Sequence, residues 1–402
     1  MPRFNSLVAL LAVGGLLLAG CSSTDANAND PVSPSASPTA TESASPTPKT
    51  PAPRAKVSIR KLGGGELLQP GDSLAIDVTG GTIRSVSVVD SKGKDLSGSL
   101  AGGVWTPNPR FLPNESYTAT AVVTNPDGKE AKATAKYRTP QGIRAGYDIL
   151  YHDQTVGVGM PVILQFVSSI KAKDLRAAIE RNIEITTVPE TEGAWGWIDN
   201  RRLMWRPKEF WKPGTKVSVK ANLAGLKTGP NKWATYNYTS DFTIGPSHIA
   251  KVDIPGHTMT FTENGKVVRT YPVTNGKRGF TTRSGTKVII EKRRRMVMDS
   301  RSISIANDSP EGYRLDVQYA MRTTWTGEFV HAAPWSVGAH GKWNASHGCT
   351  GLSIPRAAWA FNFSRVGDVI IYSGSGREMT PGEGIGVWQL SWKEWQKRSA
   401  LA

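Results

Sequence analysis

One cysteine and one histidine near the carboxyl end of the chain could serve as the nucleophile and the base of an acyl-transfer reaction. Cys349 lies in the glycine-bracketed run Gly348-Cys349-Thr350-Gly351, and His331 ends a predicted strand. A thiol near its ordinary pKa of about 8.5 is a weak nucleophile at neutral pH until a base takes its proton. A neighbouring imidazole supplies that base, and we expect it to leave an ion pair and a lowered thiol pKa. The sequence therefore predicts Cys349 as nucleophile and His331 as base.

The loop around the cysteine also has the features of an oxyanion site. Cleavage of an amide creates an oxyanion, which requires fixed hydrogen-bond donors. Glycines let the backbone bend, and we expect the N–H groups of His347, Gly348 and Cys349 to supply those donors. Two alternatives stay open: a zinc site built from Cys349 with His331, His340 and His347, and a structural cysteine with incidental histidines. No Cys-x-x-Cys or His-Glu-x-x-His motif supports zinc.

Length and charge indicate how many domains the chain has and what surrounds it. The chain has 402 residues, which predicts roughly two to four domains. Its formal net charge of +16 and pI of about 9.8 indicate anionic surroundings, such as nucleic acid, an anionic membrane or a cell-wall polymer. The amino terminus decides among these three.

The first residues have the layout of an export signal. Arg3 precedes an apolar run from about Leu7 to Leu18 that is short for a membrane span. The run ends in Leu-Ala-Gly-Cys21, which resembles the bacterial lipobox, so we expect cleavage before Cys21 and lipid on its thiol. The alternative is an ordinary signal peptide with an incidental cysteine. We therefore expect an extracytoplasmic protein, lipid-anchored to the cell membrane and facing the cell wall, with no nucleic-acid partner.

The rest of the chain divides by composition and by strand pattern. Short alternating strands with turn signals predict a mainly β protein: two immunoglobulin-like β-sandwich domains, a β-rich catalytic domain and a C-terminal helical tail. Tryptophans in the second sandwich are expected to pack in its core rather than bind glycan. The predicted segments are a signal peptide and lipobox (1–21), a Ser/Thr/Pro/Ala-rich linker (22–55), sandwiches (56–140 and 141–246), a catalytic domain (247–373) and the tail (374–402).

The order of the reactive residues points to a family. His331, followed after a Gly-, Ser-, Trp- and Asn-rich loop by Ser346-His347-Gly348-Cys349, resembles the signature of the L,D-transpeptidase (YkuD) family. The two preceding β-domains and the lipid anchor resemble the multidomain lipoprotein enzymes of mycobacteria and related actinobacteria. The resemblance covers residues 141–373 well, and 56–140 in architecture more than in motif.

The resemblance implies a role for each matching residue. Cys349 corresponds to the acylated nucleophile, His331 to the base, and His347 to a histidine that shapes the site. The backbone carbonyl of Ala332 would orient the imidazole, where relatives often carry serine. Tyr313 and Met298 match positions that line the substrate entrance. Further substrate contacts are expected from Ser346, Trp335, Thr350 and Gly351.

The resemblance also implies a reaction. The thiol would attack the carbonyl of meso-diaminopimelate, the third residue of a peptidoglycan tetrapeptide stem, and release D-Ala. A side-chain amine of a second stem would then resolve the thioester into a 3→3 cross-link. Hydrolysis by water would instead make the protein an L,D-carboxypeptidase, and a decayed site would leave a wall-binding lipoprotein. Carbapenem β-lactams acylate this cysteine in the family, and no cofactor or metal is expected.

One position departs from the family pattern, and a basic stretch suits the anionic setting. The family usually places Asn or Arg where this chain has Gly351. Since Asn and Gly both tolerate positive φ, we expect Gly351 to keep the backbone turn of the family. We also expect the substrate contact made by the Asn side chain to be lost. Arg278, Arg283, Lys287 and the run 292–295 are expected either to meet carboxylates and anionic wall polymers or to form a solvated basic strand.

Overall fold

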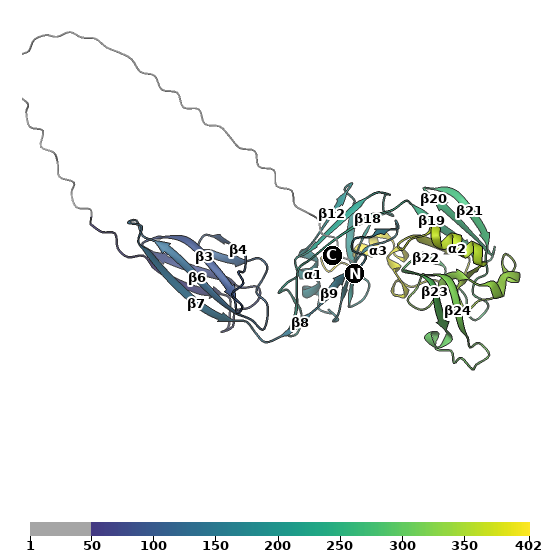
Figure 1. Ribbon diagram of the computed structural model, residues 1–402, viewed down its shortest axis with the longest axis horizontal. Helices are drawn as coiled ribbons and strands as arrows, with labels where there is room; N and C mark the ends of the chain where they lie inside the picture. Colours follow the sequence, from purple (N-terminus) through teal and green to yellow (C-terminus); the bar gives the residue numbers. More distant parts are fainter. Residues whose placement is uncertain (1–49) are drawn as a thin grey trace, which may run out of the picture. The chain divides into compact units, whose positions relative to one another are not determined.

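The computed structural model describes residues 50–402, which form a mainly β protein (Figure 1). The predicted signal peptide, Cys21 and most of the Pro-rich linker lie outside the described residues. Within the described range, no helix is long and apolar enough to cross a membrane.

The first unit is a sandwich of two antiparallel sheets with strand orders β1-β2-β5-β4 and β3-β6-β7. Trp105, Phe111 and Tyr117 fill the space between them. Asn125 starts the turn between β6 and β7, and its side chain accepts from the backbone N–H groups of Asp127 and Lys129. The strands are β1 (Lys56–Leu62), β2 (Ser73–Thr79), β3 (Thr82–Asp90), β4 (Gly98–Ala101), β5 (Val104–Pro107), β6 (Ser116–Thr124) and β7 (Glu130–Arg138).

The second unit contains sheets of order β10-β18-β15-β12 and β13-β14-β11-β9, a small sheet β16-β17-β8, and helix α1 (Lys173–Arg181). Trp197, Trp205 and Trp211 are buried, as expected of core packing. The strands are β8 (Ile143–Ala145), β9 (Tyr147–Ile149), β10 (Thr155–Val156), β11 (Val162–Phe166), β12 (Ile183–Val188), β13 (Gly193–Trp197), β14 (Arg202–Pro207), β15 (Lys216–Ala221), β16 (Lys227–Gly229), β17 (Lys232–Ala234) and β18 (Tyr238–Ile244).

The third unit packs a five-stranded sheet, β21-β20-β19-β27-β22, and a four-stranded sheet, β23-β24-β25-β26, with helix α2 (Ile354–Phe363). Asn264 and Gly265 both have positive φ, which a two-residue hairpin turn between β20 and β21 requires. The strands are β19 (His248–Asp253), β20 (Thr258–Glu263), β21 (Lys266–Pro272), β22 (Gly285–Val288), β23 (Glu291–Asp299), β24 (Arg314–Arg322), β25 (Phe329–Ala332), β26 (Thr350–Leu352) and β27 (Val369–Ser373). Short 3-10 helices η1 (Ser300–Ile303) and η2 (Pro334–Ala339) lie in its loops.

The C-terminal tail returns to the second sandwich and packs its tryptophans there. The predicted helical tail consists of three short helices, η3 (Pro381–Glu383), η4 (Gly386–Gln389) and α3 (Trp392–Gln396), and Ser391 caps the last of them. Trp395 is fully buried in the core of the second sandwich. The Arg206 guanidinium lies 4.7, 5.2 and 5.6 Å from the ring centroids of Trp388, Trp392 and Trp395.

Candidate active site

Parallel pairing of β25 with β26 brings the two reactive residues to one edge of the four-stranded sheet. Its register places His331 opposite Gly351, so Cys349 directly precedes the strand beside the histidine. Gly348 has φ +119°, a conformation that L side chains rarely adopt. Ser346 Oγ donates to the Cys349 carbonyl at 2.6 Å and accepts from the Gly348 N–H at 3.1 Å. Ser346 therefore braces the nucleophile loop while it also lines the cavity, so its substrate contact stays a prediction; the Gly348 N–H is not a free oxyanion donor.

The thiol is neutral in the resting structure. Although Cys349 is only partly buried, protein packed around the sulfur desolvates the thiolate and raises the thiol pKa to about 12, while the Phe329 N–H acts in the opposite direction. Its Sγ lies 3.7 Å from the Gly327 carbonyl oxygen. No hydrogen bond joins it to His331 among residues 50–402. The expected resting ion pair with a lowered thiol pKa is therefore wrong, because burial and the Gly327 carbonyl both favour the protonated thiol.

The histidine is prepared to accept a proton at one nitrogen. His331 Nδ1 lies 2.8 Å from the carbonyl oxygen of Ala332, as the resemblance implies. A carbonyl only accepts, so Nδ1 carries the hydrogen and the lone pair is on Nε2. Burial lowers the pKa of His331, which keeps the imidazole neutral at neutral pH. The Trp335 ring centroid lies 5.9 Å from the imidazole.

A cavity of about 210 Å³ opens over the cysteine and the histidine. Met298 on β23 and Tyr313 just before β24 line it, as does the half-exposed Trp335 of η2. Burial raises the pKa of Tyr313 to about 12, so its hydroxyl is a neutral donor or acceptor. The full lining is Met298, Tyr313, Leu315, Val317, His331, Ala333, Trp335, Ser336, Ala345, Ser346, His347, Cys349 and Gly351.

His347 pairs with Glu311, a carboxylate that it shares with Lys277 and that the sequence did not point to. Its Nε2 lies 2.6 Å from Glu311 Oε2, and Lys277 Nζ lies 2.6 Å from the same oxygen. Both contacts lower the pKa of Glu311, with that from Lys277 the larger. Glu311 belongs to the loop between β23 and β24 that also carries Tyr313. Its position 36 residues before His347 gives no local signal of the contact.

Two predicted substrate contacts are placed differently. Thr350 is fully buried, and its Oγ1 lies 2.9 Å from Asn275 Oδ1 and 3.0 Å from the Tyr372 hydroxyl, so it cannot reach a substrate. Gly351 does line the cavity, but in extended β26 and without positive φ, so the expected turn is wrong. A Cβ at Gly351 would lie 2.9 Å from Thr274 Cγ2, so close packing accounts for the glycine.

The alternative zinc site is not assembled. His340 Nε2 lies 3.5 Å from Ser336 Oγ, while His347 faces Glu311. The described part of the chain holds no group of three or more His, Cys, Asp or Glu side chains placed to bind a metal ion.

Part of the basic stretch also differs from expectation. Arg283 and Lys287 are buried and share the carboxylate of Glu328, so neither is available to an external polymer. Lys292 Nζ donates to the backbone carbonyl of Phe361 at 2.6 Å. Arg293 and Arg295 stay exposed and pair with Glu291 and Asp316.

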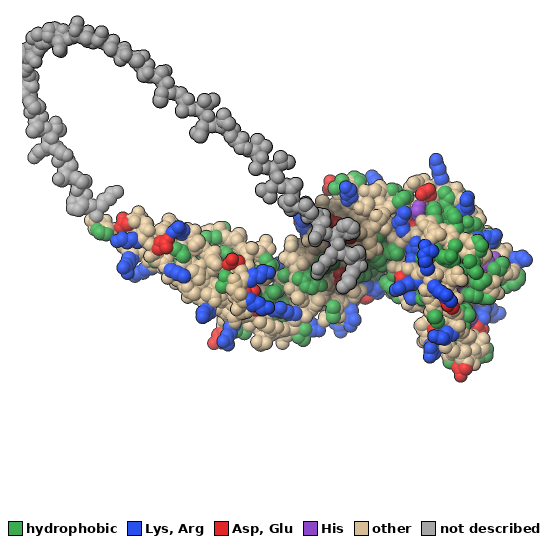
Figure 2. Space-filling model, viewed as in Figure 1, with side chains coloured by type: hydrophobic (Ala, Val, Ile, Leu, Met, Phe, Trp, Pro, Cys, Tyr) green, Lys and Arg blue, Asp and Glu red, His purple; other side chains and the backbone are tan. Residues whose placement is uncertain are grey.

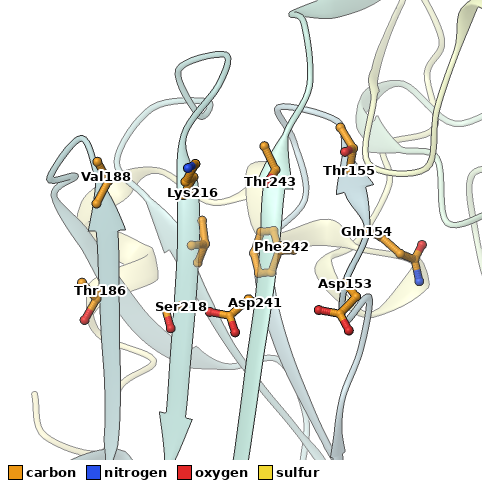
Figure 3. Close-up of a pocket in the computed structure, with 11 residues that line it drawn as sticks. Asp153, Gln154, Thr155, Thr186, Val188, Lys216, Ser218, Asp241, Phe242 and Thr243 are labelled. Atoms are coloured by element: carbon orange, nitrogen blue, oxygen red, sulfur yellow. The ribbon is translucent and has the colours of Figure 1, made fainter. Parts of the chain in front are cut away.

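A larger groove, of about 390 Å³, lies on the second sandwich and not at the cysteine. It crosses β12, β15, β18 and β10, with Thr186, Ser218, Asp241 and Asp153 along its length (Figure 3). Its lining contains neither cysteine nor histidine, so it lacks the groups that the predicted chemistry requires.

Fold and site together define a cysteine enzyme of the acyl-transfer type carried behind immunoglobulin-like domains. Residues 247–371 match the L,D-transpeptidase catalytic domain (YkuD), and residues 66–227 match a bacterial Ig domain. The chain is 34% identical over 333 residues to L,D-transpeptidase 2 of Mycobacterium tuberculosis, covering 82% of this chain and 81% of that protein. The chain belongs to the L,D-transpeptidase family.

Two further relatives also belong to the L,D-transpeptidases. L,D-transpeptidase 5 of Mycobacterium tuberculosis is 29% identical over 366 residues, which span 88% of this chain and 79% of that one. A solved LD transpeptidase in complex with imipenem is 36% identical and superposes with a TM-score of 0.50, covering 57% of this chain and 100% of the other. The predicted limits of the individual domains stay predictions.

Proposed function

We propose that this L,D-transpeptidase forms 3→3 cross-links between peptidoglycan stem peptides through a thioester on Cys349. The single observation that carries this proposal is the common cavity over Cys349 and His331, with the lone pair of His331 on Nε2. A neutral thiol beside a neutral imidazole needs one proton transfer to become a nucleophile, and that transfer accompanies attack on a bound substrate.

In the first half-reaction the Cys349 sulfur bonds to the carbonyl carbon of meso-diaminopimelate as its proton passes to His331 Nε2. The Ala332 carbonyl, hydrogen-bonded to Nδ1, stabilises the imidazolium that forms. The C–N bond to D-Ala then breaks, and the imidazolium returns its proton to the leaving amine. The product is a thioester and free D-Ala.

In the second half-reaction an amine of another stem attacks the thioester and gives its proton to His331. The C–S bond breaks, the new amide forms, and the sulfur regains a proton from the imidazolium. Water in place of the amine would give the carboxypeptidase product, so exclusion of water during the thioester stage decides between the two outcomes.

The test is to incubate the chain from residue 22 onward with disaccharide-tetrapeptide and to identify products by mass spectrometry, with Cys349→Ala as control. A dimer lacking one D-Ala, absent from the control, is the expected result. A tripeptide monomer would identify a carboxypeptidase, and unchanged substrate would favour the alternative of a wall-binding protein without activity. Incubation with imipenem should add one drug mass to Cys349, in keeping with the imipenem complex of the similar enzyme.

We further propose that Cys21 carries lipid and anchors the enzyme outside the cytoplasm, facing the wall. The apolar run that ends in Leu-Ala-Gly-Cys21 supports this proposal, and the Ser/Pro-rich stretch after it suits a tether. A palmitate analogue should label the full chain in cells but not Cys21→Ala, and the variant should leave the membrane fraction. Label retained in Cys21→Ala would contradict the anchor.

The net charge of +16 supports a third proposal, association with anionic wall polymers. Lys and Arg side chains are spread over the face shown in Figure 2, and Arg293 and Arg295 are among the exposed ones. Binding to purified wall should weaken as salt rises. Binding that does not respond to salt would contradict an electrostatic association.

A further inference from the structure

Three buried charged side chains and one partly buried carboxylate form a network beside the nucleophile loop, and the proposed reaction does not use them. Lys287 is fully buried, and its Nζ lies 2.7 Å from Glu328 Oε2. Glu328 Oε1 accepts from Arg283 twice, from the guanidinium at 2.8 Å and from the backbone N–H at 3.1 Å. Arg283 Nε also lies 2.7 Å from Glu383 Oε1, without the alignment of a hydrogen bond. Opposite charges are therefore balanced within the network.

The carboxylate end of this network touches the nucleophile loop. Glu328 directly follows Gly327, whose carbonyl oxygen lies 3.7 Å from Cys349 Sγ. The Cγ of Glu328 would lie 3.6 Å from a Cβ built at Gly348. Thr282, the residue before the arginine of the network, donates from Oγ1 to the Gly348 carbonyl at 2.9 Å. The same short segments thus carry the buried charges and hold the sulfur.

The ammonium end is linked through Tyr372 to Thr350, the residue after the nucleophile. Lys287 Nζ lies 3.8 Å from the ring centroid of Tyr372, and the Tyr372 hydroxyl lies 3.0 Å from Thr350 Oγ1. Burial lowers the pKa of Lys287, and the carboxylate of Glu328 opposes that effect. The pair therefore packs beside Gly348 at one end and is connected to Thr350 through Tyr372 at the other.

Stability alone does not explain such a network. A buried ion pair is costly to desolvate, and apolar side chains of similar volume often serve stability equally well. A charge in a poorly solvated interior does act strongly on a neighbouring ionisable group. A carboxylate near the sulfur disfavours the thiolate, and an ammonium favours it.

We propose that the buried Lys287–Glu328 pair is a positioning element for the nucleophile: it holds the Gly327–Phe329 segment against the sulfur, and its two opposite charges offset one another at the thiol. The inference rests on Cys349 being the nucleophile of the proposed reaction. It predicts opposite consequences for the loss of each partner. Without the carboxylate, uncompensated positive charge makes the resting thiol ionise more readily; without the ammonium, uncompensated negative charge makes it ionise less readily.

The test measures alkylation of Cys349 by iodoacetamide between pH 6 and pH 10 in the chain from residue 22 onward. The chain has two cysteines, and this form lacks Cys21, so Cys349 is its sole thiol. Since the thiolate is the reacting species, a thiol pKa lower by one unit raises the rate about tenfold at a given pH. We expect Glu328→Gln to raise the rate by about that factor and Lys287→Met to lower it by a similar one.

Matched variants separate this effect from simple disruption of the fold. Asp316→Asn removes a carboxylate from an exposed pair with Arg295 and should leave the rate unchanged. The double variant Glu328→Gln/Lys287→Met should return toward the original rate. Shifts of both single variants in the same direction, or no shift in either, would overturn the proposal.

A conservative variant keeps the test decisive if Glu328→Gln fails to fold. Lys287→Arg retains the charge and should keep the original rate, while Lys287→Met should not; equal rates for these two would also overturn the proposal. Alkylation requires no peptidoglycan, so its outcome is independent of whether the enzyme proves to be a transpeptidase or a carboxypeptidase.

Discussion

Replacing Gly351 with alanine tests whether close packing accounts for the glycine in β26. A Cβ there would lie 2.9 Å from Thr274 Cγ2 and 3.0 Å from Ala333 Cβ, both tighter than ordinary contacts. Thr274 is fully buried and its hydroxyl is engaged with Trp343 and Ala345, so it cannot rotate away without losing hydrogen bonds. We therefore expect Gly351→Ala to fold but to be destabilised.

The magnitude follows from overpacking of a filled interior, which costs about 1–3 kcal/mol. Thr274→Ser removes the methyl group nearest the new Cβ and keeps the hydroxyl with its two bonds. Alone it removes one buried methyl group, at a cost of about 1 kcal/mol. In the double variant the new Cβ occupies the vacated space, so the two costs should not add.

The assay is a double-mutant cycle on thermal unfolding of the chain from residue 22 onward, with iodoacetamide alkylation of Cys349 as a second reading. Gly351→Ala should lower the unfolding temperature, and the addition of Thr274→Ser should restore part of it. An unchanged unfolding temperature for Gly351→Ala would show that the neighbouring residues can move to accept the new Cβ. Strict additivity in the cycle would show that Thr274 is not the limiting contact. Either result would refute the packing explanation.

Other groups in the structure give three further expectations. Glu311→Gln should raise hydrogen–deuterium exchange in the loop between β23 and β24 with little change in unfolding temperature, because the carboxylate is exposed and its partners are partly exposed; unchanged exchange would contradict the contact. Arg206→Met should cost about 2 kcal/mol or more and make the tail, 374–402, sensitive to protease, since a buried cation over aromatic rings is lost. The lowered pKa of His331 keeps the base neutral in mild acid, so the rate of transpeptidation at saturating substrate should hold below pH 6.5, the ordinary histidine value. The rate of Cys349 alkylation should still rise at pH 10, because that pH lies below the thiol pKa of about 12. A plateau in alkylation near pH 9 would contradict that pKa.

The features predicted correctly from sequence were those fixed by local chemistry. An Asn-Gly dipeptide between two strand-like runs indicates a two-residue hairpin from sequence alone, and the structure contains one at Asn264-Gly265. The chain has two cysteines, and Cys349 lies within a motif that also contains a histidine, so nucleophile and base could be proposed without coordinates. The hydrogen bond from His331 to the Ala332 carbonyl came from the family resemblance and is present.

The errors concern which way side chains face in a strand that was taken for a turn. Residues 350–352 form β26, where alternate residues point to opposite faces. Thr350 and Leu352 therefore enter the core, and Gly351 faces the cavity. The glycines around Cys349 favoured a continuous turn, and only parallel pairing with β25 shows that the turn ends at the cysteine.

The buried lysine is a different case, because the sequence did contain a signal for it. Val288, Ile289 and Ile290 form an unbroken apolar run, and the structure buries Val288 and Ile290 in the core shared with the second sandwich but Ile289 in the catalytic core. An apolar run of this kind indicates a strand covered on both faces. Two residues before Ile289, Lys287 must share its inward face. A cation that points inward requires a buried carboxylate, and Glu328, 41 residues away, supplies it. Counting Lys287 with the basic run at 292–295 treated charge as a surface property, whereas its two-residue spacing from the buried Ile289 indicated the interior.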